Sequence, residues 1–241
     1  MAVDSEAPQA NGLRTVLDTI VAPSEAFESI RVVPTWGWAL AIAILLGAIG
    51  SYLMVPAVQH AMASDWPSMV AQNPRLAQLT PEKQQAALAT SQKLAAFSWI
   101  GVFIFVPIYC LIEAVVMLVF DKLGRGDGSF AKYFAAACNI AVPVAGIGTI
   151  INALIVVMRG PASFNTAQAV QGAVPSLAML APGVTGKFGA FLATFTPFTI
   201  WATALSIAAM LIIGRVPKLQ AWLAGIVLFL IPSLIAVSFA K

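Results

Sequence analysis

The chain has 241 residues, of which 60% are hydrophobic and 10% are charged, with a formal net charge of +3 and a mean hydropathy of +0.89. Globular domains carry about 25% charged residues, so this composition excludes an ordinary water-soluble domain and indicates a membrane protein. The 13 Lys and Arg residues are scattered between apolar runs rather than gathered in a stripe, so no nucleic-acid partner is expected.

Residues 1–35 are polar to mixed and are expected to form a cytoplasmic tail with a short amphipathic helix, after which Pro23, Glu25 and Arg31 are typical of the first position, first turn and last turn of another. No signal peptide is indicated, because this region precedes the first apolar run. Two positions remain open for the amphipathic helix: it lies in the inner membrane interface, or it packs on the inner ends of the bundle. Its apolar residues fall on one helical stripe, namely Leu13, Val16, Leu17, Ile20 and Val21.

Five apolar runs follow, each longer than the roughly 20 residues that a bilayer-spanning helix needs. They cover residues 36–58, 94–120, 133–158, 188–213 and 219–240. Because lipid offers the backbone no hydrogen-bond partners, runs of this length indicate helices. The predicted fold is therefore all-α: a polytopic membrane bundle of five transmembrane helices, with residues 36–241 forming a single transmembrane domain.

The orientation is predicted from the basic residues of the loops. With the N-terminus inside, seven Lys and Arg residues lie inside and six outside. Five of the seven are concentrated in two short loops, residues 121–132 and 214–218. Short loops determine orientation most strongly, so we expect the N-terminus inside and the C-terminus outside.

Two longer segments are predicted on the outer side. In the first, Thr80, Pro81 and Glu82 are typical of a helix start, and no breaker follows before Pro107. That helix is expected to run into the second span. The second segment, residues 160–187, either re-enters or lines the membrane, or is an ordered loop packed on the bundle.

A glycine-rich stretch, LGRGDGSF, joins the second and third spans. A phosphate-binding loop would follow a strand and have G-x-G-x-x-G spacing or a Lys-Ser/Thr pair, and this stretch has neither. The Arg-Gly-Asp tripeptide occurs by chance in many proteins. We interpret the stretch as the tight inner turn of a helix hairpin, formed by Gly124, Arg125, Gly126, Asp127 and Gly128.

Glu113 is the only acidic or basic residue predicted within a span. It lies about 12 Å from the inner end of its helix, at about 1.5 Å per residue. Asn139 and Thr203 are predicted near this depth and Asn152 further out, and Asn139 is the expected hydrogen-bond partner of Glu113. Two interpretations of this candidate intramembrane polar site remain open: an interhelical polar clamp, or a site that handles protons or a substrate.

No catalytic, cofactor or metal site is predicted, and the chain is expected not to be an enzyme. His60 is the only histidine, and it has no Cys or carboxylate neighbours at ligand spacing. Cys110 and Cys138 both lie in predicted spans, so no disulfide framework is indicated. The sequence has no G-x-S-x-G, H-E-x-x-H or C-x-x-C motif.

Three segments resemble the Yip family of Ypt/Rab-interacting membrane proteins, in its bacterial branch. They are APSEAFESIRVVPTWGWAL at 22–40, GRGDGSFAKYFAAACNIAVPVAGI at 124–147 and GRVPKLQAWLAG at 214–225. The resemblance implies a multi-span membrane protein without known catalytic residues. Eukaryotic relatives act in early secretory trafficking and bind Rab GTPases through long N-terminal regions, whereas only about 35 residues precede the first span here.

Two functions remain open. The first is a non-enzymatic membrane protein that organises the bilayer or recruits partners, with a second copy of the chain or another membrane protein as the expected partner. The second is a transporter or lipid-handling protein that uses the region around Glu113. A cavity that reaches Glu113 would favour the second function, and a closed bundle the first. The expected location is the bacterial inner membrane, or the Golgi or ER in a eukaryote.

Overall fold

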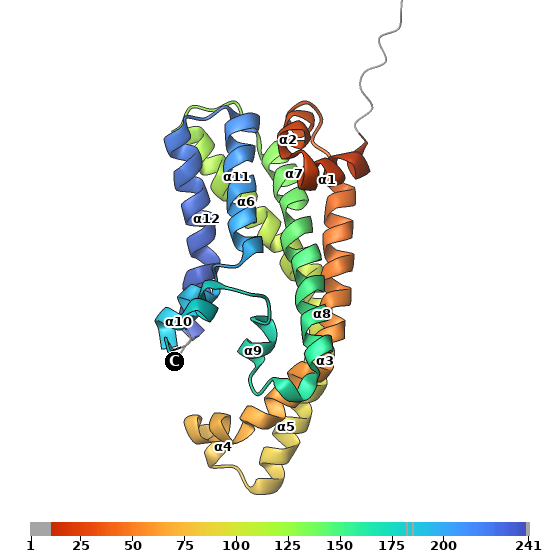
Figure 1. Ribbon diagram of the computed structural model, residues 1–241, viewed down its shortest axis with the longest axis vertical. Coiled ribbons are helices and arrows are strands. Elements are labelled where there is room, and N and C mark those ends of the chain that lie inside the picture. Colours follow the sequence, from red (N-terminus) through yellow and green to blue (C-terminus); the bar gives the residue numbers. More distant parts are fainter. Residues whose placement is uncertain (1–10, 182, 185, 240–241) are drawn as a thin grey trace, which may run out of the picture.

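The computed structural model describes residues 11–181, 183–184 and 186–239 (Figure 1). Every regular element in these ranges is a helix. Five of the helices are long and apolar enough to cross a membrane: Gly37–Gln72, Ser98–Leu123, Phe130–Arg159, Pro197–Gly214 and Lys218–Ser238. This confirms the predicted all-α fold with five membrane-spanning helices.

Two short helices, α1 (Gly12–Val21) and α2 (Pro23–Val32), lie across one end of the bundle (Figure 1). The side chain of Asn11 caps α1 by accepting a hydrogen bond from the backbone N–H of Leu13 at 3.1 Å. Pro23 begins α2, a position at which its missing N–H costs no hydrogen bond. Both helices therefore begin where local chemistry favours a helix start.

The first span, α3 (Gly37–Gln72), is longer than predicted. Its 36 residues measure about 54 Å at 1.5 Å per residue, whereas the hydrocarbon core of a bilayer is about 30 Å thick. The helix therefore continues well beyond the predicted end at residue 58. Beyond it lie α4 (Pro74–Ala77) and α5 (Pro81–Ala96), which project from the bundle as an outer arm (Figure 1).

The outer arm is fastened to α3 by a reciprocal pair of glutamines. The Nε2 of Gln59 donates to the carbonyl of Gln92 at 3.0 Å, and the Nε2 of Gln92 donates to the carbonyl of Gln59 at 3.1 Å. The helix of this arm begins at Pro81, as predicted. It does not continue unbroken into the second span, because the chain tightens into the 3₁₀-helix η1 (Ser98–Gly101) before α6 (Val102–Leu123).

The third span consists of α7 (Phe130–Ala141), the π-helix η2 (Val142–Gly148) and α8 (Thr149–Arg159). Pro143 has no N–H to donate, and a wide π-turn is a common way for a helix to absorb such a residue. Where α8 packs against α3, an added Cβ at Gly50 would lie 2.9 Å from the carbonyl oxygen of Thr149. Glycine is thus required for the close contact between α3 and α8.

The segment after α8 is an ordered loop against the bundle. It contains η3 (Pro161–Ser163), α9 (Ala167–Gln171), η4 (Leu177–Leu180) and the start of α10 (Gly186–Ala193). Phe164, Val170 and Ala173 are buried in a hydrophobic cluster with Ala57 of α3 and Val156 of α8. Residues 164–173 therefore agree with the packed loop, whereas Leu177, Met179 and Leu180 of η4 are 40%, 49% and 82% exposed.

The predicted fourth span, residues 188–213, is wrong at its outer end. The chain breaks at residues 194–196, between α10 and α11 (Pro197–Ala209), and the span continues through the π-helix η5 (Met210–Gly214). The break has a local cause: Pro197 cannot donate to the preceding turn, and Thr196 and Thr199 form a capping box that starts a new helix. The last span is α12 (Lys218–Phe239), within one residue of its predicted bounds over the described part.

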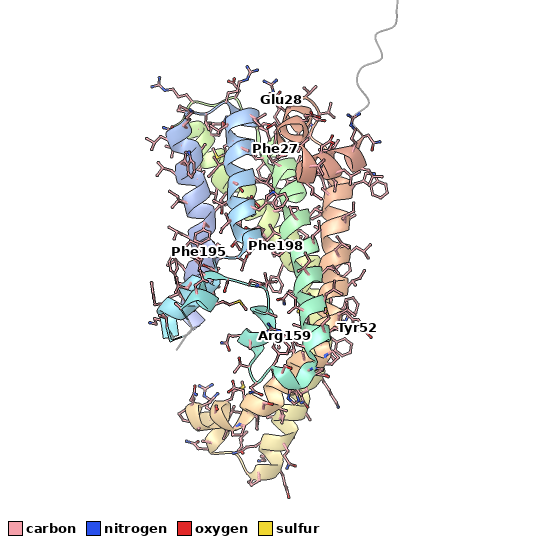
Figure 2. The ribbon with its side chains drawn as sticks, in the orientation of Figure 1. Phe27, Glu28, Tyr52, Arg159, Phe195 and Phe198 are labelled. Carbon is pink, nitrogen blue, oxygen red and sulfur yellow. The ribbon has the colours of Figure 1, made fainter. Side chains whose placement is uncertain are left out.

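The central helix of the bundle is α7. It lies against α2, α3, α6 and α11, and its buried residues include a continuous run from Ala135 to Ala141. Small side chains let helices approach closely, which drives helix association in membranes. The aromatic ring of Phe27, on α2, is fully buried in the same core and points inward (Figure 2). The N-terminal helices are therefore part of the bundle.

The loop between α6 and α7, the turn before α12 and the helix pair α1–α2 lie at one end of the bundle (Figure 1). The outer arm lies at the other end. Which end faces the cytoplasm stays a prediction. Cysteine labelling tests it: a cysteine at Ser129 should react only from the inside, and one at Ser68 only from the outside.

Candidate functional site

Glu113 lies on α6 and is only 2% exposed. The Oγ of Ser206, on α11, lies within hydrogen-bond distance of two oxygens: Oε1 of Glu113 at 2.8 Å and the carbonyl oxygen of Ala202 at 2.9 Å. A hydroxyl has one hydrogen, so both contacts are satisfied together when a protonated Glu113 donates to Ser206 and Ser206 donates to Ala202. The geometry therefore fits a neutral Glu113 that links α6 to α11.

The other carboxyl oxygen of Glu113 has no partner. Oε2 is buried and forms no hydrogen bond with any described residue. An unsatisfied buried polar atom costs about 1–3 kcal/mol, and more if the group is charged. The missing partner is a second reason for a neutral carboxyl group at this position.

The expected hydrogen bond between Glu113 and Asn139 is wrong. The Nδ2 of Asn139 donates to the carbonyl of Thr35 at 3.0 Å and to the carbonyl of Ala135, within α7, at 2.8 Å. Asn139 thus joins α7 to the connection between α2 and α3. Equal depth in two helices does not fix which way each side chain faces, and here the amide faces away from α6.

The remaining candidate residues also do not meet at Glu113. The Oγ1 of Thr203 donates to the carbonyl of Thr199 in its own helix at 2.9 Å. Asn152 donates to the carbonyl of Val170 at 2.9 Å and accepts from the backbone N–H of Val174 at 3.0 Å. Asn152 therefore fixes the packed outer loop to α8. The structure brings Glu113 together with Ser206, and places the other three residues elsewhere.

A cavity of about 190 Å³ lies beside this pair, between α11 and α12. It reaches Ser206, but Glu113 is not among its lining residues. Pockets for drug-sized ligands measure about 300–1,000 Å³, so this one is too small for a lipid. Its walls are mostly apolar, with hydroxyl groups contributed by Tyr109, Thr194, Thr196, Thr199, Thr203, Ser206 and Ser233.

Ser206 was missed in the sequence although a signal for it exists. Thr199, Thr203 and Ser206 are spaced i, i+4 and i+7, which places three hydroxyls on one face of α11. Ser233, on α12, faces the same cavity, and its Oγ donates to the Oγ1 of Thr194 at 3.1 Å. A hydroxyl-bearing helix face opposite a lone carboxylate is the pattern to look for.

The glycine-rich turn folds around a second buried carboxylate, Asp121, which is 0% exposed. Its Oδ1 accepts from the hydroxyl of Tyr133 at 2.6 Å and from the backbone N–H of Gly128 at 3.1 Å. Its Oδ2 accepts from the Nζ of Lys122 at 3.0 Å, and the same Nζ donates to the carbonyl of Gly128 at 2.9 Å. Asp121 thus binds the end of α6 to the start of α7.

The backbone of this turn has no N–H groups left for a phosphate. The N–H of Gly126 donates to the carbonyl of Asp121 at 2.8 Å, that of Asp127 to the carbonyl of Gly214 at 2.9 Å, and that of Gly128 to the Asp121 side chain. The structure therefore agrees with the interpretation of this stretch as a tight hairpin turn. The Asp127 contact also joins the turn between α6 and α7 to the end of η5.

The described residues contain no group of three or more His, Cys, Asp or Glu side chains able to hold a metal ion. Cys110 and Cys138 are both buried and both free.

Together, the five apolar spans and the polar clamps between them define a multi-pass helical membrane protein. The model of the Yip1 domain family matches residues 17–240, and the chain belongs to this family. The chain is also similar to membrane protein YknW of Bacillus subtilis strain 168, with 21% identity over 228 residues, which cover 94% of this chain and 90% of the relative. No solved structure matches. The family resemblance seen in the sequence is thereby confirmed.

Proposed function

We propose that this protein organises the bilayer, without catalysing a reaction, by holding an amphipathic helix in one leaflet. The observation that carries the proposal is an exposed apolar row on α1. Leu13, Leu17 and Val21 are spaced four residues apart and are 43%, 62% and 78% exposed. An apolar row of this kind, beside the membrane end of a span, suits the boundary between headgroups and acyl chains.

The opposite face of α1 packs against the bundle and so keeps the apolar row facing outward. Thr15, Val16 and Thr19 are buried against the bundle. The exposed rings of Trp36 and Trp38 lie at the start of the first span, where interfacial aromatics anchor membrane helices. Because α1 is attached on one side and apolar on the other, it would occupy area in one leaflet only.

The enclosed carboxylates support this function over transport. Glu113 and Asp121 both join helices in the interior and line no cavity among those described. We place the protein in the bacterial inner membrane, with α1 on the cytoplasmic side. Assembly with a second copy or another membrane protein would increase the density of such helices.

Vesicle shape tests the proposal. The full chain is reconstituted into phospholipid vesicles and the vesicle diameters are measured by electron cryomicroscopy. We expect the wild-type protein to narrow and tubulate vesicles in proportion to its density. The double variant Leu17→Glu, Val21→Glu should lose this effect, because two carboxylates oppose insertion of α1, while Leu17→Ile, Val21→Ile should retain it.

Two results would contradict the proposal. Vesicles that keep their diameter at high wild-type density would show that the protein does not shape bilayers. Equal tubulation by the glutamate and isoleucine variants would show that α1 is not the cause. Both substitutions are at exposed positions, so the fold should persist, and circular dichroism of the same samples verifies this.

A second candidate function rests on the mostly apolar cavity with several hydroxyl groups that ends at Ser206, the residue bonded to Glu113, whose Oε2 has no partner among the described residues. If the cavity were part of a proton pathway, wild-type vesicles loaded with a pH-sensitive dye would leak protons faster than empty ones. Glu113→Gln would abolish that leak without unfolding the protein. Proton flux equal to that of protein-free vesicles would exclude this function.

A further inference from the structure

An open recess of about 260 Å³ lies at the end of the bundle that carries α2 and the two turns. Three basic side chains from three separate elements line it: Arg31 of α2, Lys132 of α7 and Arg215 of the turn before α12. Asp127 is the one acidic residue lining it, and Val32 and Ile213 complete its walls. We call this feature the basic recess.

Two of the three basic side chains of the basic recess have no ion-pair partner among the described residues. Arg31 pairs with Glu28 through Nη2 and Oε2 at 2.7 Å, yet its Nε is buried without a hydrogen-bond partner. Figure 2 shows Glu28 at the outer rim of this end of the molecule. Within the described part of the chain, neither Lys132 nor Arg215 takes part in an ion pair.

The backbone conformation of the turn before α12 constrains Arg215. Arg215 adopts a left-handed conformation with φ 52°, unusual for a residue with a side chain. The N–H of Asp127 donates to the carbonyl of Gly214, immediately before Arg215. Such a conformation is maintained by the contacts around it, and Arg215 lines the recess from this turn.

The basic recess lies at the level of an aromatic cluster. Lys132 is flanked along α7 by Phe130 and Phe134, whose stacked ring centroids are 6.0 Å apart. The ring of Trp36 meets Phe134 edge-on at 5.5 Å, and Phe130 and Trp36 are 40% and 47% exposed. Aromatic residues of this kind mark the headgroup level of a bilayer.

We propose that the basic recess binds the phosphate group of an anionic ligand, with the guanidinium groups of Arg31 and Arg215 and the ammonium of Lys132 as its donors. Guanidinium and ammonium groups are the side chains that recognise phosphate. The position beside the aromatic cluster favours a phospholipid headgroup, and basic sites between spans are known to bind such lipids. The backbone of the glycine-rich turn takes no part, since its N–H groups are already used.

This inference does not depend on bilayer shaping. The test measures retention of phosphatidylglycerol by the detergent-purified full chain, using native mass spectrometry, with phosphatidylcholine as the uncharged reference lipid. Binding of inorganic phosphate is measured in parallel by equilibrium dialysis. The two arms distinguish a lipid headgroup from a free phosphate as the source of the ligand.

The variant Lys132→Gln, Arg215→Gln removes two donors. Each cation near a headgroup contributes about fivefold, so phosphatidylglycerol affinity should fall about thirtyfold. The control Arg14→Gln, Lys218→Gln removes the same charge from the same end of the molecule, outside the recess, and should change the affinity little. The charge-preserving pair Lys132→Arg, Arg215→Lys should retain most of the binding.

The outcomes separate clearly. If only the recess variant loses binding, of either phosphatidylglycerol or inorganic phosphate, the result supports the site. An equal loss in the control would assign the binding to diffuse surface charge and overturn the proposal. Wild-type protein that binds neither phosphatidylglycerol above phosphatidylcholine nor inorganic phosphate would also overturn it. Because the vesicle assay changes only α1, failure there leaves this result unaffected.

Discussion

The bundle contains two buried carboxyl groups, Asp121 and Glu113, whose surroundings differ. Asp121, at the end of α6, accepts hydrogen bonds from Tyr133, Gly128 and Lys122, so that both of its oxygens are satisfied. Glu113, eight residues earlier in the same helix, has a single contact with Ser206 and a second oxygen without a partner. Asp121 is held by a cation, whereas no basic residue in the described part of the chain is bonded to Glu113.

The difference indicates what each residue does. A charged carboxylate can be buried when a cation and several donors compensate it, as around Asp121. One shared hydroxyl cannot compensate a charge in the middle of a span, so Glu113 fits a neutral group. Asp121 therefore determines the structure of the hairpin, and Glu113 contributes one interhelical hydrogen bond.

The largest effect is expected at Asp121. Replacing it by leucine leaves the hydroxyl of Tyr133, the N–H of Gly128 and the ammonium of Lys122 without their acceptor. Each buried donor left unsatisfied costs about 1–3 kcal/mol, so the two neutral donors together account for about 2–6 kcal/mol, while the Lys122 side chain is 61% exposed and can be hydrated. Asp121→Asn should cost about 1–3 kcal/mol, because an amide oxygen can still accept from Tyr133 and Gly128. Unfolding by SDS in mixed micelles measures both changes.

If Asp121→Leu lowers the free energy of unfolding by less than about 1 kcal/mol, the scale of one interhelical hydrogen bond, Asp121 does not differ from Glu113. The variant Tyr133→Phe helps to apportion the effect. It deletes only the phenolic hydroxyl, and should therefore cost less than Asp121→Leu.

A smaller effect is expected where a neighbouring glycine makes room for this network. A Cβ at Gly214 would collide with the hydroxyl of Tyr133 and with Oδ1 of Asp121. Overpacking of this kind costs about 1–3 kcal/mol, so Gly214→Ala should destabilise the protein by that amount. Gly37→Ala is the matched control, because nothing lies within 4 Å of its added Cβ. Equal stability of the two variants in the SDS assay would show that the network tolerates displacement.

The smallest effects are expected at Glu113. Glu113→Leu removes one hydrogen bond and should cost about 1 kcal/mol, the scale of interhelical hydrogen bonds in membranes. Glu113→Gln keeps a group that can bond to Ser206, so the free energy of unfolding should stay almost unchanged. A cost for Glu113→Gln as large as that of Asp121→Asn would mean that the charge of Glu113 matters.

The spans could be predicted from the sequence because their lengths and lack of charge leave a bilayer as the only suitable surroundings. The hairpin turn could also be predicted, since glycines between two apolar runs permit little else. The break before Pro197 was missed because it lies in a long run without charged residues, and proline is tolerated within membrane helices. Thr196 and Thr199, spaced as a capping box, were the available signal.

The partners of the buried polar groups could not be predicted. A span length fixes depth along the membrane normal but not rotation about the helix axis, and successive residues turn by about 100°. Asn139 was therefore placed at the correct depth for Glu113 but faces Thr35 instead. The link between Asp121 and Tyr133 was missed because Asp121 was assigned to a loop.

The most direct test of the central claim is the protonation of Glu113, followed by infrared difference spectroscopy of the reconstituted protein with Glu113→Gln as the reference. If Glu113 is a neutral clamp, its protonated carbonyl band stays constant as the pH is varied around neutrality, and proton flux is absent. A band that disappears on passing through neutral pH, together with flux that Glu113→Gln abolishes, would contradict the account and assign the intramembrane site to proton handling.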